Sequence, residues 1–414
     1  TRGTDNVKEV FGEIFVPIVS DRPFFQNLSL NASARYTDYA SYGSDTTYKV
    51  AGEWEFFKGV GIRGSYGTSY RAPALSEQFL GATSGFSSGG NDPCDSDNFP
   101  RDNGQPNPSA YSVSQQQRAA NCKSIGIDTD TFQQNSSITL FQRGGAETGL
   151  SAETSRNWSV GAVVQPRISS STTLGLALDY FDILVSNGVS SISGSTILSR
   201  CYSAVDFSPT EGFCKFVKRD GNQLLTVTSG YVNLSQDVVK GFELTGRFAT
   251  ILFGGRFTFN ANMTKYTEQS DKTFPEEILL DSNGTLNVPD LVGNFDVTYS
   301  TGPATFRYGV SWFDGSSGTA VYTQTSRTTG LVNQANVDFL NEYYQIEVPD
   351  YYLHSASVQL NITDKFQMTL GVRNLLDKDP PKITAYYTTI GNAPLYSGYD
   401  YTGRQWFINT NFKF

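Results

Sequence analysis

The chain has 414 residues, and its 31 basic and 40 acidic side chains give a formal net charge of −9. An acidic chain lacks the positive surface that binds nucleic acid. One histidine and four cysteines are too few for a multi-histidine metal site or a zinc cluster. No apolar run reaches the roughly 18 residues of a membrane helix, and no signal-peptide pattern begins at Thr1. The length fits two or three soluble domains, or one large closed β-structure.

Segments of about ten residues alternate apolar and polar side chains along almost the whole chain, which is the period of a β-strand. In one such segment Leu174, Leu176 and Leu178 alternate with Thr173, Gly175 and Ala177. Most segments are close to the roughly 9–11 residues that a tilted membrane strand needs. We predict no independent domain and about thirteen strands: 7–18, 25–39, 45–57, 60–72, 151–165, 171–187, 236–249, 253–267, 290–301, 303–314, 351–362, 366–374 and 403–414.

The predicted connections alternate between short and long, with 40–44 as the exception. Short turns at one end of the strands and long loops at the other are typical of an outer-membrane barrel. A soluble sandwich gives no reason for such regular alternation. We therefore expect one barrel portion over residues 1–414 whose long extracellular loops are 73–150, 188–235, 268–289, 315–350 and 375–402.

The two faces of the predicted strands differ in a way that favours a membrane. The apolar faces end in aromatic residues such as Tyr66, Trp158 and Trp312, which suits the girdles at the two membrane interfaces. The polar faces are rich in arginine, whose rigid fork pairs with carboxylates in a lumen filled by protein. These polar-face residues are Arg35, Arg63, Arg71, Arg247, Arg256, Arg307, Arg373, Glu13, Glu53 and Glu243. The pattern predicts an all-β, transmembrane antiparallel β-barrel.

The orientation follows from the last strand. It begins after the long loop 375–402, so Phe414 is expected on the short-turn, periplasmic side. Counting strands backward places Thr1 on the long-loop, extracellular side.

Several segments resemble a known family. Tyr70-Arg71-Ala72-Pro73, followed by Glu77 and Phe79, resembles a segment of TonB-dependent outer-membrane receptors. The octapeptide GVRNLLDK at 371–378 resembles a segment near their C-terminus, and the alternating strand that ends at Phe414 resembles their last strand. The segment Val10-Phe11-Gly12-Glu13, with Pro17 beyond it, is similar to a mid-barrel strand of the family. The order and spacing of these segments, over nearly the whole chain, strengthen the match.

The resemblance implies a barrel of 22 strands closed by an N-terminal plug and driven by the TonB–ExbB–ExbD complex of the inner membrane. It implies energy-coupled uptake of an iron-siderophore, cobalamin or glycan across the outer membrane of a Gram-negative bacterium, without catalysis or a cofactor. The predicted strands would be the last thirteen of the 22. We therefore expect a C-terminal fragment, or one polypeptide of a nicked receptor, that needs the plug, the remaining strands and outer-membrane lipid as partners.

The four cysteines lie in two predicted loops and permit three disulfide connectivities. Local pairing of Cys94 with Cys122 and of Cys201 with Cys214 fits best, because each pair then staples one loop. The cell surface is oxidising, so disulfides persist there. The lone His354 shares the apolar phase of its strand with Tyr352 and is expected in an interfacial girdle.

Tyrosines and amides are frequent in the predicted loops, and we expect them to bind the ligand. A ring stacks and an amide both donates and accepts, which suits sugars or catecholates. The equally weighted alternative is that these tyrosines pack the loops against each other. The candidates are Tyr111, Tyr322, Tyr343, Tyr344, Tyr386, Tyr387, Tyr396, Tyr399 and Tyr401.

The polar-face arginines and glutamates are expected to form ion pairs with the plug. A cluster of Asp92, Asp95, Asp97 and Asp102 lacks the spacing of an EF-hand, so a solvated acidic loop is the default interpretation and a Ca²⁺ site the alternative.

Two other functions remain as alternatives. A general diffusion porin would share the alternation but usually has shorter loops and segregated charges in its lumen. A secreted enzyme or glycan-binding protein would need carboxylates paired across a cleft. Glu53 and Glu55 share one strand face and are interpreted as structural.

Overall fold

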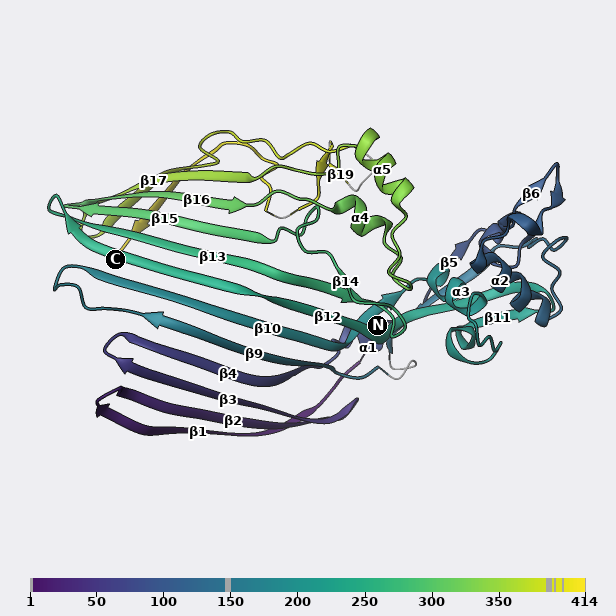
Figure 1. Cartoon of the computed structure of the whole chain (residues 1–414), viewed down its shortest axis with the longest axis horizontal. Helices are drawn as coiled ribbons and strands as arrows, with labels where there is room; N and C mark the ends of the chain where they lie inside the picture. The colour runs from purple at the N-terminus through teal and green to yellow at the C-terminus, as the bar shows by residue number, and fades with distance from the viewer. Residues whose placement is uncertain (1–2, 146–149, 385–388, 391, 397, 414) are drawn as a thin grey trace.

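The computed structural model describes residues 3–145, 150–384, 389–390, 392–396 and 398–413. Within them, thirteen long strands follow one another as an antiparallel meander that forms a single curved sheet (Figure 1). The predicted number of strands is confirmed. They are β1 (Val7–Arg22), β2 (Phe25–Tyr39), β3 (Gly43–Phe57), β4 (Val60–Arg71), β9 (Glu153–Val164), β10 (Thr173–Ile192), β12 (Gln223–Leu252), β13 (Gly255–Lys272), β15 (Leu291–Thr301), β16 (Ala304–Phe313), β17 (Tyr351–Thr363), β18 (Phe366–Arg373) and β21 (Gln405–Phe412).

The sheet is part of a barrel rather than a closed one. Each of the thirteen strands pairs with its neighbours in the chain, and no pairing joins β1 to β21 among the described residues. The two ends of the sheet differ as predicted. At one end, here called the turn end, tight turns such as Phe253-Gly254 connect the strands; both residues have positive φ, as a two-residue hairpin turn of type I′ requires. At the other, the loop end, the long connections gather.

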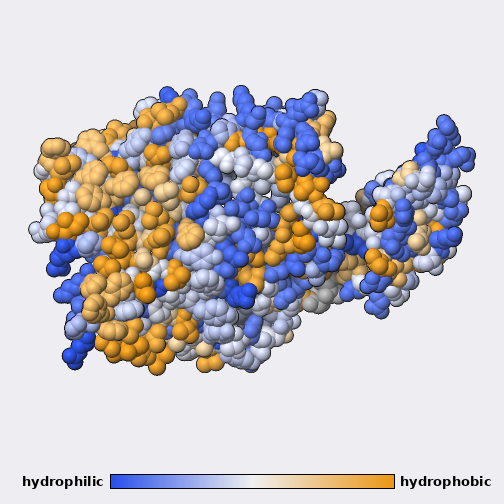
Figure 2. Space-filling model, viewed as in Figure 1, coloured by the Kyte–Doolittle hydropathy of each residue, from blue (hydrophilic) through white to orange (hydrophobic). Residues whose placement is uncertain are grey.

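The register of the strands separates an apolar outer face from a polar lumen face. Leu178 pairs with Ala162 and Leu244 on the outer face, while the next residue, Asp179, pairs with Gly161 and Glu243 on the lumen face. Apolar outer residues are open: Leu176 is 43% exposed and Leu370 is 38% exposed. Figure 2 shows hydrophobic residues gathered in a wide patch over the strands, toward the turn end. A second sheet that would bury them is absent from the described residues, so this face is the one that meets lipid.

No described helix has the length and apolar character needed to cross a bilayer.

Three strands extend furthest beyond their predicted bounds, all of them at the loop end. β10 continues to Ile192, β13 continues to Lys272, and β12 begins at Gln223 and runs for 30 residues. The predicted loop bounds at 188, 235 and 268 were therefore wrong. A strand of 30 residues far exceeds the roughly 9–11 needed to cross the hydrocarbon, so part of it stands outside the membrane. There β12 has no lipid-facing side, and Leu224 and Val227 are instead buried in a core formed by the long loops, so the alternation of the membrane part ends.

The first two long loops fold together into one unit at the loop end, which we call the stapled unit (residues 83–143 and 193–230). It contains β5 (Thr83–Ser87), β6 (Arg101–Asp102), β7 (Gln105–Pro106), α2 (Val113–Ser124), β8 (Ile138–Arg143), α3 (Gly194–Tyr202), β11 (Val217–Asp220) and the start of β12. The unit has a core of its own, with Ile127, Ile197 and Leu224 almost fully buried. We predicted no independent domain and overlooked this core, because short helices interrupt the strand pattern.

The other loops form a second group at the loop end, which we call the cap (residues 273–290, 314–350 and 374–404). Its elements are β14 (Leu280–Asp281), α4 (Thr319–Gln324), α5 (Gln334–Tyr343), β19 (Thr389–Ile390) and β20 (Ala393–Pro394). Backbone hydrogen bonds join the three segments, among them Ile278 N–H to Arg327 O at 2.8 Å and Thr384 N–H to Gln345 O at 2.8 Å. In Figure 1 the helices of the cap and the stapled unit stand apart at the loop end. The short helix α1 (Leu75–Phe79) follows β4.

Candidate lumen face and loop-end site

Four of the seven predicted lumen arginines form ion pairs with nearby carboxylates. Arg63 on β4 donates to both carboxylate oxygens of Asp179 on β10, at 2.8 and 2.6 Å. Arg35 pairs with Glu9 at 2.8 Å, Arg71 pairs with Glu153 and Glu77, and Arg307 pairs with Asp296. Arg35, Arg71 and Arg307 tie adjacent strands together on the polar face, whereas Arg63 reaches across β9 to β10. The four guanidinium groups remain about half exposed, so their open side faces the space that the sheet encloses.

At the centre of the lumen face, several carboxylates lie around Arg63. Glu53 lies beside Arg63 in the register of β3 and β4, and Glu243 lies beside Asp179 in the register of β10 and β12. Three carboxylates therefore surround one guanidinium. Glu13, further along the face, accepts a hydrogen bond from Asn31 at 2.7 Å. The centre of the lumen face has an excess of negative charge.

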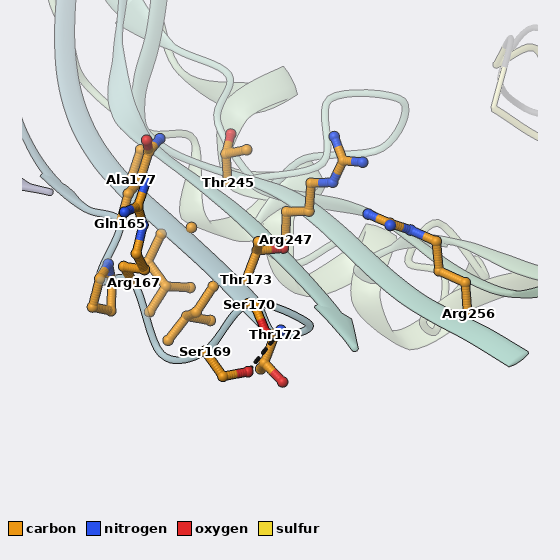
Figure 3. A pocket seen from close by; sticks show the side chains of 14 residues that line it. Gln165, Arg167, Ser169, Ser170, Thr172, Thr173, Ala177, Thr245, Arg247 and Arg256 are labelled. Carbon is orange, nitrogen blue, oxygen red and sulfur yellow. Dashed lines mark hydrogen bonds between the residues drawn. The ribbon is translucent and has the colours of Figure 1, made fainter. Parts of the chain in front are cut away.

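The turn end of the lumen face has the opposite sign. Arg247 on β12 and Arg256 on β13 border a hollow of about 970 Å³, together with Arg167 from the turn that precedes β10 (Figure 3). In that turn the Thr172 N–H donates to the Ser169 hydroxyl at 3.0 Å. No carboxylate of the described residues pairs with these three arginines. The last predicted lumen arginine, Arg373, lies over the ring of Phe407 at 5.5 Å.

Most predicted ligand-binding tyrosines of the described residues hold the loops together. Tyr111 is buried and its hydroxyl donates to Asp130 at 3.3 Å. Tyr322 accepts from Arg327 at 3.0 Å, and Tyr401 donates to the carbonyl of Pro394. Tyr396 and Tyr399 pack against each other at 5.1 Å between ring centres, and Tyr399 also packs on Tyr351. Tyr386 and Tyr387 lie outside the described residues. The packing alternative therefore describes these five tyrosines better than ligand binding does.

Helix α5 presents an open aromatic surface in the cap. Tyr343 is 64% exposed, and its ring lies 5.0 Å from that of Phe339, which is 51% exposed. Tyr344 lies beside Phe339 at 5.8 Å. We call these three residues the α5 ledge. Sequence reasoning included both tyrosines but missed Phe339, because no helix was predicted; the spacing of four residues between Phe339 and Tyr343 was the available signal.

Two carboxyl groups meet where β15 begins and β16 ends. Asp314 accepts a hydrogen bond from the Leu291 N–H at 3.2 Å, and Asp290 pairs with Lys265. Burial, together with the neighbouring Asp290, raises the pKa of Asp314 to about 6. Tyr396 and Tyr399 lie near Asp314, and burial also raises the pKa of both phenols. This junction is a place where the protonation state of the cap changes close to neutral pH.

Two of the four aspartates in the acidic cluster of the first loop are buried. Asp92 is fully buried, where it accepts from Arg219, and Asp95 accepts from the backbone N–H groups of Asp97 and Gln134 at 2.9 and 2.8 Å. The described residues contain no group of three histidine, cysteine or acidic side chains arranged to hold a metal ion. These two carboxylates therefore act as structural acceptors.

Both predicted disulfides are present. Cys94 is bonded to Cys122 and Cys201 to Cys214, and all four lie in the core of the stapled unit. His354 lies on the outer face, with its Nδ1 2.6 Å from the hydroxyl of Tyr308.

Comparisons with known proteins place this sheet in a family. The family model for the TonB dependent receptor-like β-barrel matches residues 19–375. The solved ferric enterobactin receptor PfeA from Pseudomonas aeruginosa aligns with a TM-score of 0.60 at 16% identity, covering 99% of this chain and 46% of that one. The siderophore receptor PirA from Acinetobacter baumannii aligns with a TM-score of 0.56 at 15% identity, again over 99% and 46%.

A curated relative, the vitamin B12 transporter BtuB of Vibrio cholerae serotype O1, is 38% identical over 55 residues, which are 13% of this chain and 9% of that protein. The chain therefore spans less than half the length of the receptors it matches. Because the family model matches most of the chain, and because the strands, their register and their apolar outer face agree with it, the chain belongs to the TonB-dependent receptor family and supplies strands of its outer-membrane β-barrel.

Proposed function

We propose that this chain forms part of the wall and the extracellular vestibule of an energy-coupled importer for a scarce nutrient. TonB-dependent receptors act with a plug domain and with TonB. The observation that carries the proposal is the lumen face, where paired but half-exposed arginines and unpaired charges line a space that β1 and β21 leave open. The plug, the missing strands and the TonB–ExbB–ExbD complex would be its partners.

The proposed plug contacts follow from the charges of the lumen face. Glu53, Asp179 and Glu243 share one arginine, so they would accept basic side chains of the plug. Arg247 and Arg256 have no carboxylate partner in the described chain and would accept acidic ones. Charges of opposite sign at two depths of the lumen would fix the orientation of the plug as well as its position.

The proposed orientation puts the loop end outside the cell and the C-terminus in the periplasm. The stapled unit and the cap support it, because long connections of outer-membrane barrels lie on the outer side and short turns on the periplasmic side. The two disulfides fit an oxidising surface. The chain would perform no covalent chemistry, since its part in transport is to bind cargo and enclose its path.

Uptake measurements test the proposal against the porin alternative. Cells that make the complete receptor are compared with cells that also lack TonB, using labelled ferric siderophore, cobalamin and oligosaccharides. The proposal predicts that uptake of one of these classes is lost without TonB, and that the purified receptor conducts no steady ion current in a planar bilayer. TonB-independent uptake with a large constant current would identify a porin instead.

A further inference from the structure

The cap carries far more acidic than basic side chains. Segment 314–350 has Arg327 as its one basic residue, against Asp314, Asp338, Glu342, Glu347 and Asp350. Segment 273–290 has no basic residue and contains Glu276, Glu277, Asp281 and Asp290. Most of these carboxylates are exposed, among them Glu276, Asp281, Asp338, Glu342 and Asp350. The cap therefore presents a negative surface toward the water at the loop end.

Three arginines at the loop end are occupied by internal contacts. Arg327 pairs with Asp271 at 2.7 Å and donates to Tyr322. Arg200 pairs with Glu276 and Glu277 and lies over the ring of Phe274 at 3.8 Å, while Arg219 is held by Asp92. Three of the four basic residues of the cap, Lys378, Lys382 and Arg404, have no ion-pair partner in the part of the chain that the structure describes, and they share the third segment with Asp377, Asp379 and Asp400. Carboxylates therefore outnumber basic groups in the cap.

The negative surface of the cap disfavours the binding of anionic iron chelates. A ferric tris-catecholate carries several negative charges, and a surface of the same sign slows its approach and lowers its affinity. A neutral ligand with many hydroxyl groups has no such conflict, because hydroxyls donate hydrogen bonds to carboxylates. The surface therefore suits an uncharged, hydroxyl-rich ligand.

The α5 ledge supplies the second part of such a site. The rings of Phe339 and Tyr343 are open, and the exposed carboxylates of Asp338 and Glu342 stand next to them in the sequence of the same helix. Asp338 accepts one hydrogen bond from Gln334 at 2.8 Å, which leaves its other lone pairs available. Aromatic faces pack on the C–H faces of pyranose rings while carboxylates accept from the hydroxyls at the ring edge.

Resting on the function proposed above, we infer that the cargo is an uncharged saccharide and that the α5 ledge is one of its contact surfaces. The exposed rings give the saccharide a stacking surface, and the acidic cap discriminates against anionic chelates. The inference concerns the class of cargo and leaves the identity of the sugar to the measurement.

The test is calorimetric titration of the complete receptor, purified from outer membranes with its plug. The probes are a panel of neutral α- and β-linked hexose and N-acetylhexosamine oligosaccharides, ferric enterobactin, cyanocobalamin and spermidine. We expect one or more saccharides to bind, with a Kd that changes less than about twofold between low and high salt because no ion pair is involved. We expect no binding of ferric enterobactin.

Variants locate the contact. F339A combined with Y343A is expected to raise the saccharide Kd at least about tenfold, the order expected when stacking contacts are lost. The matched control is F253A, which removes a phenylalanine that is 90% exposed at the turn end and should leave the Kd unchanged. An unchanged Kd in the double variant would remove the ledge from the site.

Two other results would overturn the saccharide assignment. One is binding of ferric enterobactin, cobalamin or spermidine without any saccharide, and the other is no binding of any saccharide in the panel. Either would leave TonB-dependent transport intact. Conversely, saccharide binding combined with TonB-independent uptake would refute energy-coupled import and would leave the assignment of a saccharide cargo intact.

Discussion

Arg219 and Asp92, which are 127 residues apart in the sequence, form a bidentate pair in the stapled unit, with Nη1–Oδ2 and Nη2–Oδ1 distances of 2.8 and 2.5 Å. Asp92 lies two residues before Cys94, and Arg219 lies five residues after Cys214, so the pair joins the two disulfide-containing loops. The hydroxyl of Tyr202 accepts a third hydrogen bond from Arg219 at 2.6 Å. Burial acts to lower the pKa of Arg219, but the Asp92 carboxylate and the Tyr202 hydroxyl together outweigh it and raise that pKa. This buried ion pair therefore joins the two loops into one folded unit.

Replacing Asp92 with asparagine should loosen the stapled unit. The change leaves the Arg219 charge buried without its counter-charge, which costs about 3–5 kcal/mol. We expect protease cleavage within 83–143 at much lower protease concentrations than in the wild type, with the barrel strands still resistant. D97N is the control, because Asp97 is an exposed carboxylate in the same segment. Equal resistance of D92N and D97N would show that the pair does not hold the loops.

The disulfides make a separate contribution to the same unit. C201S with C214S opens the shorter link, whose cysteines are 13 residues apart, and C94S with C122S opens the longer one, at 28. Each pair of changes should reduce the stability of the unit by about 2–4 kcal/mol, with the larger loss for the longer link. The measurement is protease resistance of the unit against temperature. Thiol titration of unreduced wild-type protein should find no free thiol, and two free thiols per chain would show that one of the two bonds is not formed.

The basic end of the lumen gives a third prediction. R247Q combined with R256Q should weaken the attachment of the plug, because acidic plug side chains lose hydrogen bonds to charged groups worth about 1.5–3 kcal/mol each. The complete receptor should then release its plug at lower urea concentration, seen as protease sensitivity of the plug or as ion conductance. R307Q is the matched control, since Arg307 already pairs with Asp296 in the wall. Release at the wild-type urea concentration in the double variant would remove these two arginines from the plug contact.

The Asp290 and Asp314 junction predicts a pH dependence of the cap. The pKa of Asp314 is raised from 3.8 in its ordinary state to about 6 in the folded protein, by burial and by Asp290. The folded cap therefore favours the protonated carboxyl, and this stabilisation is fully present below pH 4 and is lost as the pH rises through 6. Resistance of the cap to protease should fall between pH 4 and pH 6 and then level off.

The D314N variant tests that assignment. Asparagine cannot ionise, so the variant should be more resistant than the wild type at pH 7 and should lose the pH dependence between 4 and 6. Lys265, Asp290, Tyr396 and Tyr399 face the same junction. Burial acts to raise the pKa of Asp290, but its hydrogen bonds to Asp314 and Lys265 outweigh burial and lower that pKa. Burial raises the pKa of both phenols, so these shifts lead away from the interval. E342Q, which removes an exposed carboxylate of α5, is the control. A D314N profile that follows the wild type would assign the titration to another group.

The sequence predicted the membrane part of the fold well, and the reason is physical. Where a strand has lipid on one side and a polar lumen on the other, each residue must match its side, as Leu178 and Asp179 do. The disulfide pairing was predicted on a different ground, because the four cysteines fall two to a loop and local pairs staple each loop. Outside the membrane the constraint disappears, and the extensions of β10, β12 and β13 were therefore missed.

The candidate site was harder to predict, because loop tyrosines serve packing and binding with the same residue type. Tyr399 is buried against Tyr351, whereas Tyr343 is exposed on α5. The residues that flank each tyrosine in the sequence do not reveal which of the two is buried. Phe339 was missed because α5 was not expected. The pairing of Arg63 with Asp179 was also invisible, since the two residues are 116 positions apart and meet only through the register of β4, β9 and β10.

Spin labels on two adjacent residues of β10 test the central assignment most directly. The cysteines of the described chain are all in disulfides, so L178C and A177C each give one labelling site in the complete receptor reconstituted in lipid bilayers. If the outer face meets lipid, the label at 178 collides with oxygen and is shielded from a water-soluble nickel chelate, whereas the label at 177 is shielded from oxygen. Equal nickel accessibility at the two positions would place the apolar face in water or inside a protein core, and would contradict the barrel account.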